Sequence, residues 1–285
     1  MNILYITKGD HVDYQNDCLL IGLKELFGDK VVDYNKQEHN YVTYPSDKTK
    51  DLYGKGMTVS RVLPDLEVDR TDITNKIKNK FFDLVVYGSI WRCSDHIHNI
   101  LNHYSNNKVI AVDGEDHVGI NTVFDLGILY FKRELVYEND RILPISFGIP
   151  ESKINFNKNK IKDFSYITPL DKETYIYDNE KDYYNDYSEA RFGVTMKKGG
   201  WDCLRHYEIM ANGCLPYFLE IENCPPKTMT TFPKELCKKI SQNIKEVNSQ
   251  DLYAELCNEF ETHLLNNNTT RKVAEKFIND VNKFK

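Results

Sequence analysis

Residues 196–216 read MKKGGWDCLRHYEIMANGCLP and connect two predicted strands, Phe192–Thr195 and Leu215–Leu219. The paired glycines mark a turn, and Cys203–Asn212 has the length and composition of a short helix. Gly213 fits the left-handed position that commonly follows a helix C-terminus. A strand, a helix and a second strand in succession predict a unit of an α/β fold with parallel strands.

The first 150 residues show the same alternation of strand and helix signals. The predicted strands are Ile3–Thr7, Val31–Tyr34, Asp83–Gly88, Val109–Val112, Ile128–Phe131 and Ile142–Phe147. The predicted helices are Asp17–Phe27, Asp72–Lys80 and Asp95–Tyr104, the last with Ser94 as its N-cap. Alternation of this kind predicts a mainly parallel sheet covered by helices on both faces.

A second lobe is predicted after Ile149–Pro150, where the alternating strand and helix signals are interrupted by a polar stretch. Its further elements are a strand at Phe164–Ile167 and helices at Asp182–Ala190, Asp251–Leu265 and Thr270–Phe284. We therefore divide the chain into an N-terminal lobe, residues 1–150, and a C-terminal lobe with a final helix, residues 151–285. Residues 37–65 are polar and irregular, which predicts a surface loop.

Composition excludes several classes of protein. No apolar run approaches the roughly 20 residues that span a bilayer, and the N-terminus lacks the pattern of a signal peptide, so we expect a cytoplasmic protein. Seven cysteines without paired spacing indicate reduced thiols rather than a disulfide framework or a zinc site. Residues 1–150 carry 17 basic and 22 acidic residues, a net charge of −5, which disfavours a large nucleic-acid footprint.

The turn at Lys197, Lys198, Gly199 and Gly200 predicts a phosphate site, because amides at a helix N-terminus and lysine side chains both bind phosphate. Arg205 lies one turn into the helix, where it can reach a phosphate oxygen. Glu208 shares that face and can accept hydrogen bonds from vicinal hydroxyls. The alternative interpretation is a plain turn followed by a surface ion pair between Arg205 and Glu208.

Two common nucleotide motifs are missing from the sequence. No GxGxxG follows the first strand, which argues against an ordinary dinucleotide-binding lobe, and no GxxxxGK[ST] is present, which argues against a P-loop enzyme. The remaining candidates are α/β proteins that hold a nucleotide by other means.

At residues 205–216 the chain resembles the GT-B glycosyltransferases, and among them the short family-1-like and CgeB-like members. Glu208 to Pro216 is similar to their signature E-x-x-A-x-G-x-x-P. Asp113–His117 and Phe131–Leu135 also resemble that group. The resemblance implies two Rossmann-like lobes with parallel sheets facing a cleft, and a UDP- or GDP-sugar as donor substrate rather than a bound cofactor. It further implies Glu208 on the ribose hydroxyls, Arg205 as phosphate counter-charge and no obligatory metal.

The chain departs from this pattern at one position. Retaining GT-B enzymes often carry an acidic residue eight positions before the equivalent of Glu208, and Gly200 stands there in this sequence. Retention or inversion of the sugar configuration is therefore left open. The acceptor implied by the resemblance is a glycan, a lipid-linked group or another hydroxyl compound.

Candidate acceptor-side residues follow the strands of the N-terminal lobe, because ligands bind beyond the carboxyl ends of parallel strands. We assign Asp10, His11 and Trp91 to the acceptor side. An inverting reaction needs a base near the acceptor hydroxyl, and Asp116 and His117, with Asp113, are the candidates. The acidic loop at 113–116 also resembles the metal-binding DxD of other transferases, but it lies in the wrong lobe, so no metal is predicted.

Two rival functions stay open. A viral transferase that glucosylates modified DNA bases would have the same size and lobes, although the charge of the N-terminal lobe weighs against a nucleic-acid acceptor. A module that binds a nucleotide sugar without catalysis is compatible with Gly200 at the position of the missing acid.

Overall fold

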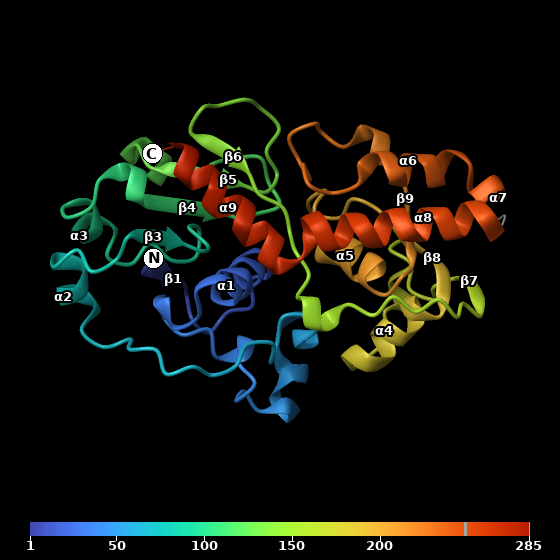
Figure 1. Ribbon diagram of the computed structural model, residues 1–285, viewed down its shortest axis with the longest axis horizontal. Coiled ribbons are helices and arrows are strands. Elements are labelled where there is room, and N and C mark those ends of the chain that lie inside the picture. The colour runs from blue at the N-terminus through green and yellow to red at the C-terminus, as the bar shows by residue number, and fades with distance from the viewer. Residues whose placement is uncertain (248–249, 285) are drawn as a thin grey trace.

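Two parallel sheets form the framework of the computed structural model, which describes residues 1–247 and 250–284 (Figure 1). The first sheet has the order β2-β1-β3-β4-β5-β6, with bounds Val31–Tyr34, Ile3–Ile6, Leu84–Tyr87, Val109–Asp113, Leu129–Lys132 and Ile142–Pro144. The second has the order β7-β8-β9, with bounds Lys162–Phe164, Ala190–Thr195 and Leu215–Phe218. All pairings between these strands are parallel, so the predicted two-lobed α/β fold is confirmed.

The first sheet is buried on both faces, as its continuous apolar strands require. Alternate residues of each strand point to opposite faces, so Ile3 and Tyr5 enter one core while Leu4 and Ile6 enter another. The helices α1 (Tyr14–Phe27) and α9 (Thr270–Phe284) cover the first face, and α2 (Ile73–Lys78) and α3 (Ile97–Leu101) cover the second.

The last helix, α9, returns from the second lobe to the first and packs along α1 (Figure 1). Phe277 contacts Phe131 of β5 with ring centroids 4.6 Å apart. The two helices approach closely at Gly22, where an added Cβ would lie 2.0 Å from the Thr270 carbonyl oxygen. The first lobe is thus completed by residues from the far end of the chain.

The second sheet packs against α4 (Glu180–Ser188), α5 (Leu204–Ala211), α6 (Lys234–Gln242) and α8 (Gln250–His263), and α7 (Ile244–Val247) joins α6 to α8. Its main core also takes in Val12, Ile21 and Phe147 of the first lobe, so an apolar cluster is shared across the boundary. None of the described helices has the length and apolar character needed to cross a membrane.

Several predicted elements differ from the structure. Strand β7 occupies Lys162–Phe164, earlier than the predicted Phe164–Ile167, because it pairs with β8 through Lys162 and Phe164. Helix α3 begins at Ile97 after His96, so the predicted N-cap at Ser94 is wrong. Helices α6 and α7 were not anticipated. The predicted loop contains the short 3₁₀ helices Glu38–Asn40, Ser46–Asp51 and Tyr53–Gly56.

The close approach at Gly22 gives a stability prediction. Gly22→Ala would normally favour a helix, but here the methyl group would collide with the backbone of Thr270, and overpacking of this kind costs about 1–3 kcal/mol. We expect urea denaturation to give a correspondingly lower free energy of unfolding. The control is Gly119→Ala, whose Cβ would meet only the His117 ring at 3.3 Å. Equal stability of the two variants would contradict the α1–α9 packing.

Candidate active site

Two cavities adjoin one another: residues of both lobes line the first, and the described residues that line the second all belong to the N-terminal lobe. The smaller, of about 210 Å³, is lined by Tyr14, Gly54, Lys55, Met57, Ile167, Tyr175, Tyr177, Tyr183, Cys203, Leu204, Arg205 and Glu208. The larger, of about 330 Å³, is lined by His11, Val12, Asp13, Tyr14, Gln15, Tyr53, Arg92, Gly114, Glu115, Asp116, Arg133 and Phe147. Tyr14 belongs to both, so the two cavities adjoin at its side chain. We call them the Glu208 cavity and the Asp116 cavity.

Glu208 is buried in the wall of the Glu208 cavity and is 6% exposed. The Thr58 hydroxyl donates to one carboxylate oxygen and the Tyr183 hydroxyl to the other. Burial raises the pKa of Glu208, while these two hydrogen bonds act in the opposite direction. Within the described residues Glu208 forms no ion pair with Arg205, so the alternative interpretation of a surface ion pair is wrong.

The segment 54–58 of the N-terminal lobe closes over Glu208, a role that the sequence did not reveal. In addition to the bond from its hydroxyl to Glu208, Thr58 donates its amide to Glu180 at 2.5 Å, and Lys55 pairs with Asp178, so several contacts fix the segment to the C-terminal lobe. Thr58 has a φ of 73°, which is strained for a β-branched residue. The only sequence signal was the spacing of Gly54 and Gly56, which indicated a turn but not its partner.

Arg205 and Lys198 lie against the ring of Tyr175, which lines the Glu208 cavity. The Arg205 guanidinium lies 4.7 Å from the Tyr175 ring centroid and donates from Nη1 to its hydroxyl at 2.6 Å. The Lys198 ammonium lies 5.2 Å from the same ring, and Lys197 lies 5.7 Å from the Trp201 ring. Neither lysine has an ion-pair partner in the described part of the chain. Three cations therefore gather beside the turn.

The amides that follow the glycine pair bind a carboxylate of the other lobe. Trp201 and Asp202 each donate a backbone N–H to Glu134, at 2.9 Å. A Cβ on Gly200 would lie 2.5 Å from the Glu134 Oε1 atom, so this approach requires glycine. The anion at these two amides in the structure is thus Glu134.

Arg133, the residue directly before Glu134, joins the two lobes. Its buried guanidinium donates to the Asp202 carbonyl and pairs with Asp116 and with Glu134, the latter at 3.0 Å. Asp116 remains 62% exposed and faces the turn, because a Cβ on Gly199 would fall 2.1 Å from its Oδ2 atom. The structure therefore brings Asp116 together with Gly199 and Gly200.

Asp113 is fully buried and accepts four hydrogen bonds, which leaves it no access to a ligand. The donors are Trp91 Nε1 at 2.8 Å, Lys132 Nζ at 2.9 Å, the Tyr130 hydroxyl at 2.5 Å and the Glu115 amide at 3.0 Å. We therefore assign it a positioning role in place of the predicted catalytic one. Asp113 holds Trp91 by a hydrogen bond. Trp91 in turn contacts the His117 ring edge-on, with the two ring centroids 5.1 Å apart.

The predicted acceptor-side residues are distributed over three places. His11 lines the Asp116 cavity, whereas Asp10 lines a separate cavity with Lys8, Asn35 and His39. Trp91 lies with His117 on an exposed part of the first lobe and lines neither of the two cavities described above. Among the described residues, no cluster of three or more histidines, cysteines and carboxylates is arranged to hold a metal ion.

Two ionisable side chains fix the start of α5. His206 is completely buried; its Nε2 lies 2.8 Å from the Trp201 carbonyl oxygen and its Nδ1 lies 2.8 Å from the Thr195 hydroxyl. Burial lowers the pKa of His206 to about 3, so the ring is neutral, with its proton on Nε2. Burial raises the pKa of the Asp202 carboxyl to about 7, although Arg133 opposes that shift.

The low pKa of His206 predicts how stability varies with pH. Its folded value lies below the unfolded value of 6.5, so the stability from the neutral ring is present above pH 6.5 and is lost as the pH falls towards 3. Between pH 7 and 5 the loss is about 2 kcal/mol.

The measurement is the free energy of unfolding at both pH values for the native protein and for His206→Gln. Asp202 titrates in both proteins, so the difference isolates His206. Between pH 7 and 5 we expect the free energy of unfolding to fall less in His206→Gln than in the native protein. In the control His98→Gln, whose histidine is exposed, it should fall as much as in the native protein. A fall in His206→Gln as large as in the native protein would show that the buried ring is not the source.

No family model matches the chain, and no curated protein matches its sequence. Among solved structures the chain is similar to one described as "alpha-glucosyltransferase in complex with UDP and a 13-mer DNA containing a central A:G mismatch". The similarity covers 98% of each chain with a TM-score of 0.42 and 10% sequence identity. At that level it adds nothing to the assignment of the site, which depends on the contacts described above.

Proposed function

We propose that the protein is a glycosyltransferase that uses a nucleotide sugar as donor, in a GT-B arrangement. One observation carries the proposal: each carboxylate oxygen of buried Glu208 accepts a hydrogen bond from a hydroxyl, in the wall of a cavity that Arg205 also lines, and the cations of Lys197 and Lys198 lie over the nearby Trp201 and Tyr175 rings. A ribose offers the same pair of hydroxyl donors, and a diphosphate is the anion that the cations would attract.

The Glu208 cavity suits a nucleoside in shape and lining. Four tyrosines and Arg205 supply flat surfaces for a base, and Glu208 supplies the acceptor for sugar hydroxyls. Its volume is about 210 Å³, below the usual range of about 300–1,000 Å³ for ligand pockets, so a whole nucleotide sugar would extend beyond it. The adjoining Asp116 cavity gives the remaining space.

The basic turn would stabilise the leaving group. When the bond from the sugar to the diphosphate breaks, negative charge grows on the diphosphate oxygens, and Lys197, Lys198 and Arg205 lie on the side where that charge forms. In an inverting transfer, Asp116 would take the proton of the acceptor hydroxyl as its oxygen attacks the anomeric carbon. We favour Asp116 over His117 because Asp116 lines the cavity beside the turn.

Binding without catalysis is the second candidate, and Glu134 favours it. Its carboxylate already occupies the amides of Trp201 and Asp202, so these two groups are not free to stabilise the negative charge that a catalysed transfer would place on the leaving diphosphate. A binding module would take up a nucleoside diphosphate and a nucleotide sugar without releasing product.

A donor panel tests the proposal. UDP- and GDP-sugars are incubated with the protein and a mixture of hydroxyl acceptors, and release of nucleoside diphosphate is measured together with donor affinity by calorimetry. Glu208→Gln removes the charge that accepts hydroxyl hydrogen bonds, so we expect about 10- to 100-fold weaker donor binding. Glu255→Gln, on the exposed side of α8, is the control. Binding without release would favour the binding module, and no nucleotide binding would exclude both functions.

The identity of the base gives a further prediction. Asp116→Asn should lower kcat by about 10²- to 10⁴-fold with little change in donor affinity, because the amide cannot take the acceptor proton. His117→Asn is compared in the same assay, with Asp125→Asn as the control on an exposed turn. A loss confined to His117→Asn would move the base to that residue and reject Asp116.

A further inference from the structure

Gln15 is a buried polar side chain whose carboxamide has no partner. It lies in the first turn of α1, just after Asp13, which caps the helix by accepting the amides of Gln15 and Asn16. The residue is 1% exposed, and neither its Oε1 nor its Nε2 atom has a hydrogen-bond partner within the described chain. A buried amide without partners destabilises the protein, so a ligand that supplies them is the natural explanation.

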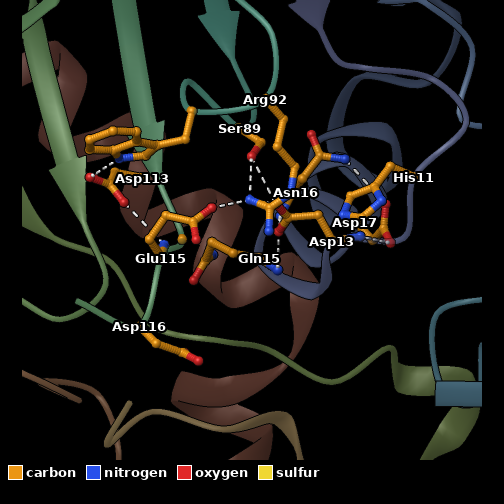
Figure 2. A network of polar contacts seen from close by, with 12 residues as sticks. His11, Asp13, Gln15, Asn16, Asp17, Ser89, Arg92, Asp113, Glu115 and Asp116 are labelled. Atoms are coloured by element: carbon orange, nitrogen blue, oxygen red, sulfur yellow. Dashed lines mark hydrogen bonds and ion pairs between the residues drawn. The ribbon is translucent and has the colours of Figure 1, made fainter. Parts of the chain in front are cut away.

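The position of Gln15 indicates where that ligand would bind. It lines the Asp116 cavity beside Glu115 and the Arg92 guanidinium (Figure 2). A Cβ on Gly114 would lie 2.6 Å from the Gln15 Cβ, so glycine at 114 allows the cavity loop to approach this side chain. A glutamine carboxamide turns about flexible torsions and can present its donor and its acceptor to the cavity together.

The charges around the cavity favour a neutral ligand. Arg92 pairs with Asp13 at 3.1 Å and with Glu115, while Arg133 pairs with Asp116 and Glu134. Both guanidiniums of the lining are therefore already neutralised, and the carboxylates exceed them in number. An anionic group would meet repulsion here, whereas hydroxyls would find acceptors.

The wall shared with the Glu208 cavity suits one face of a sugar ring. Tyr14 and Tyr53 lie with their ring centroids 5.7 Å apart, and both line the Asp116 cavity. Aromatic faces pack against the C–H face of a pyranose while its hydroxyls point to polar groups. Asp116 also adjoins Gly199 of the basic turn, so this cavity lies next to the place proposed for the diphosphate.

We propose that the Asp116 cavity binds the neutral hexopyranosyl group of the donor, and that the Gln15 carboxamide donates to and accepts from two neighbouring hydroxyls of that sugar. This assignment rests on the proposed donor function and adds to it the class of sugar: a neutral hexose, not a uronic acid. It also gives the N-terminal lobe a part in donor recognition, in addition to the acceptor.

Calorimetry with matched ligands tests the assignment. The probes are UDP, UDP-glucose and UDP-glucuronate, with GDP and GDP-mannose in parallel, and the variant is Gln15→Met, which keeps the volume but removes both polar atoms. In the native protein the sugar nucleotide should bind more tightly than the diphosphate alone, and UDP-glucose more tightly than UDP-glucuronate. Gln15→Met should bind the diphosphate normally and the neutral sugar nucleotide about 5- to 50-fold more weakly.

A second readout separates binding from a purely structural role. Because the amide is unsatisfied in the free protein, Gln15→Met should raise the thermal unfolding midpoint, whereas a structural glutamine would lower it on replacement. Gln242→Met, at the exposed end of α6, is the control and should change neither affinity nor midpoint.

The other outcomes are decisive. If Gln15→Met leaves donor affinities unchanged but raises the KM of a sugar acceptor, the cavity binds the acceptor and the donor assignment is overturned. If the diphosphate binds as tightly as the sugar nucleotide in the native protein, the inference fails while the donor function survives. If neither UDP nor GDP binds, the proposed function itself fails, and this inference with it.

Discussion

The buried guanidinium of Arg133 is the contact on which the geometry of the cleft depends. It reaches from the end of β5 to the turn before α5, where it meets the Asp202 carbonyl, Glu134 and Asp116. A charge removed from water must be paired, and breaking a buried pair by removing one partner costs about 3–5 kcal/mol. The cluster therefore joins the end of β5 to the turn before α5. Its acids share a single cation, and burial raises the pKa of Asp202 to about 7 despite Arg133.

Apolar packing supports the same arrangement from behind the cleft. The core of the second lobe includes side chains of the first, and α9 crosses back to cover the first sheet. The segment 54–58 is held to the C-terminal lobe mainly by polar contacts, and it includes the strained Thr58. Groups that line the Glu208 cavity thus come from the helix α5 on one side and from this short segment on the other.

Local patterns predicted most of the framework, because strand alternation and helix length are properties of neighbouring residues. They located β2 and α9 to the residue and the helix that carries Glu208 to within one residue at each end. Contacts between distant segments could not be predicted this way. The pairing of Thr58 with Glu208 joins residues 150 positions apart, and Glu134 reaches amides 67 and 68 positions away. Asp113 had the right residue type after the right strand, yet its burial depends on Lys132 and Tyr130, which no local pattern connects to it.

The return of α9 to the first lobe also has a consequence for synthesis. Ribosomes make a chain from its N-terminal end, so the strands of the first sheet are synthesised well before residues 270–284. Until then the face of the sheet that receives Val273 and Phe277 lacks part of its cover. The first lobe therefore reaches its final packing only after α9 has been synthesised, and its last step of folding waits for that helix. Until that step, the nascent protein exposes an apolar surface of the kind that chaperones bind.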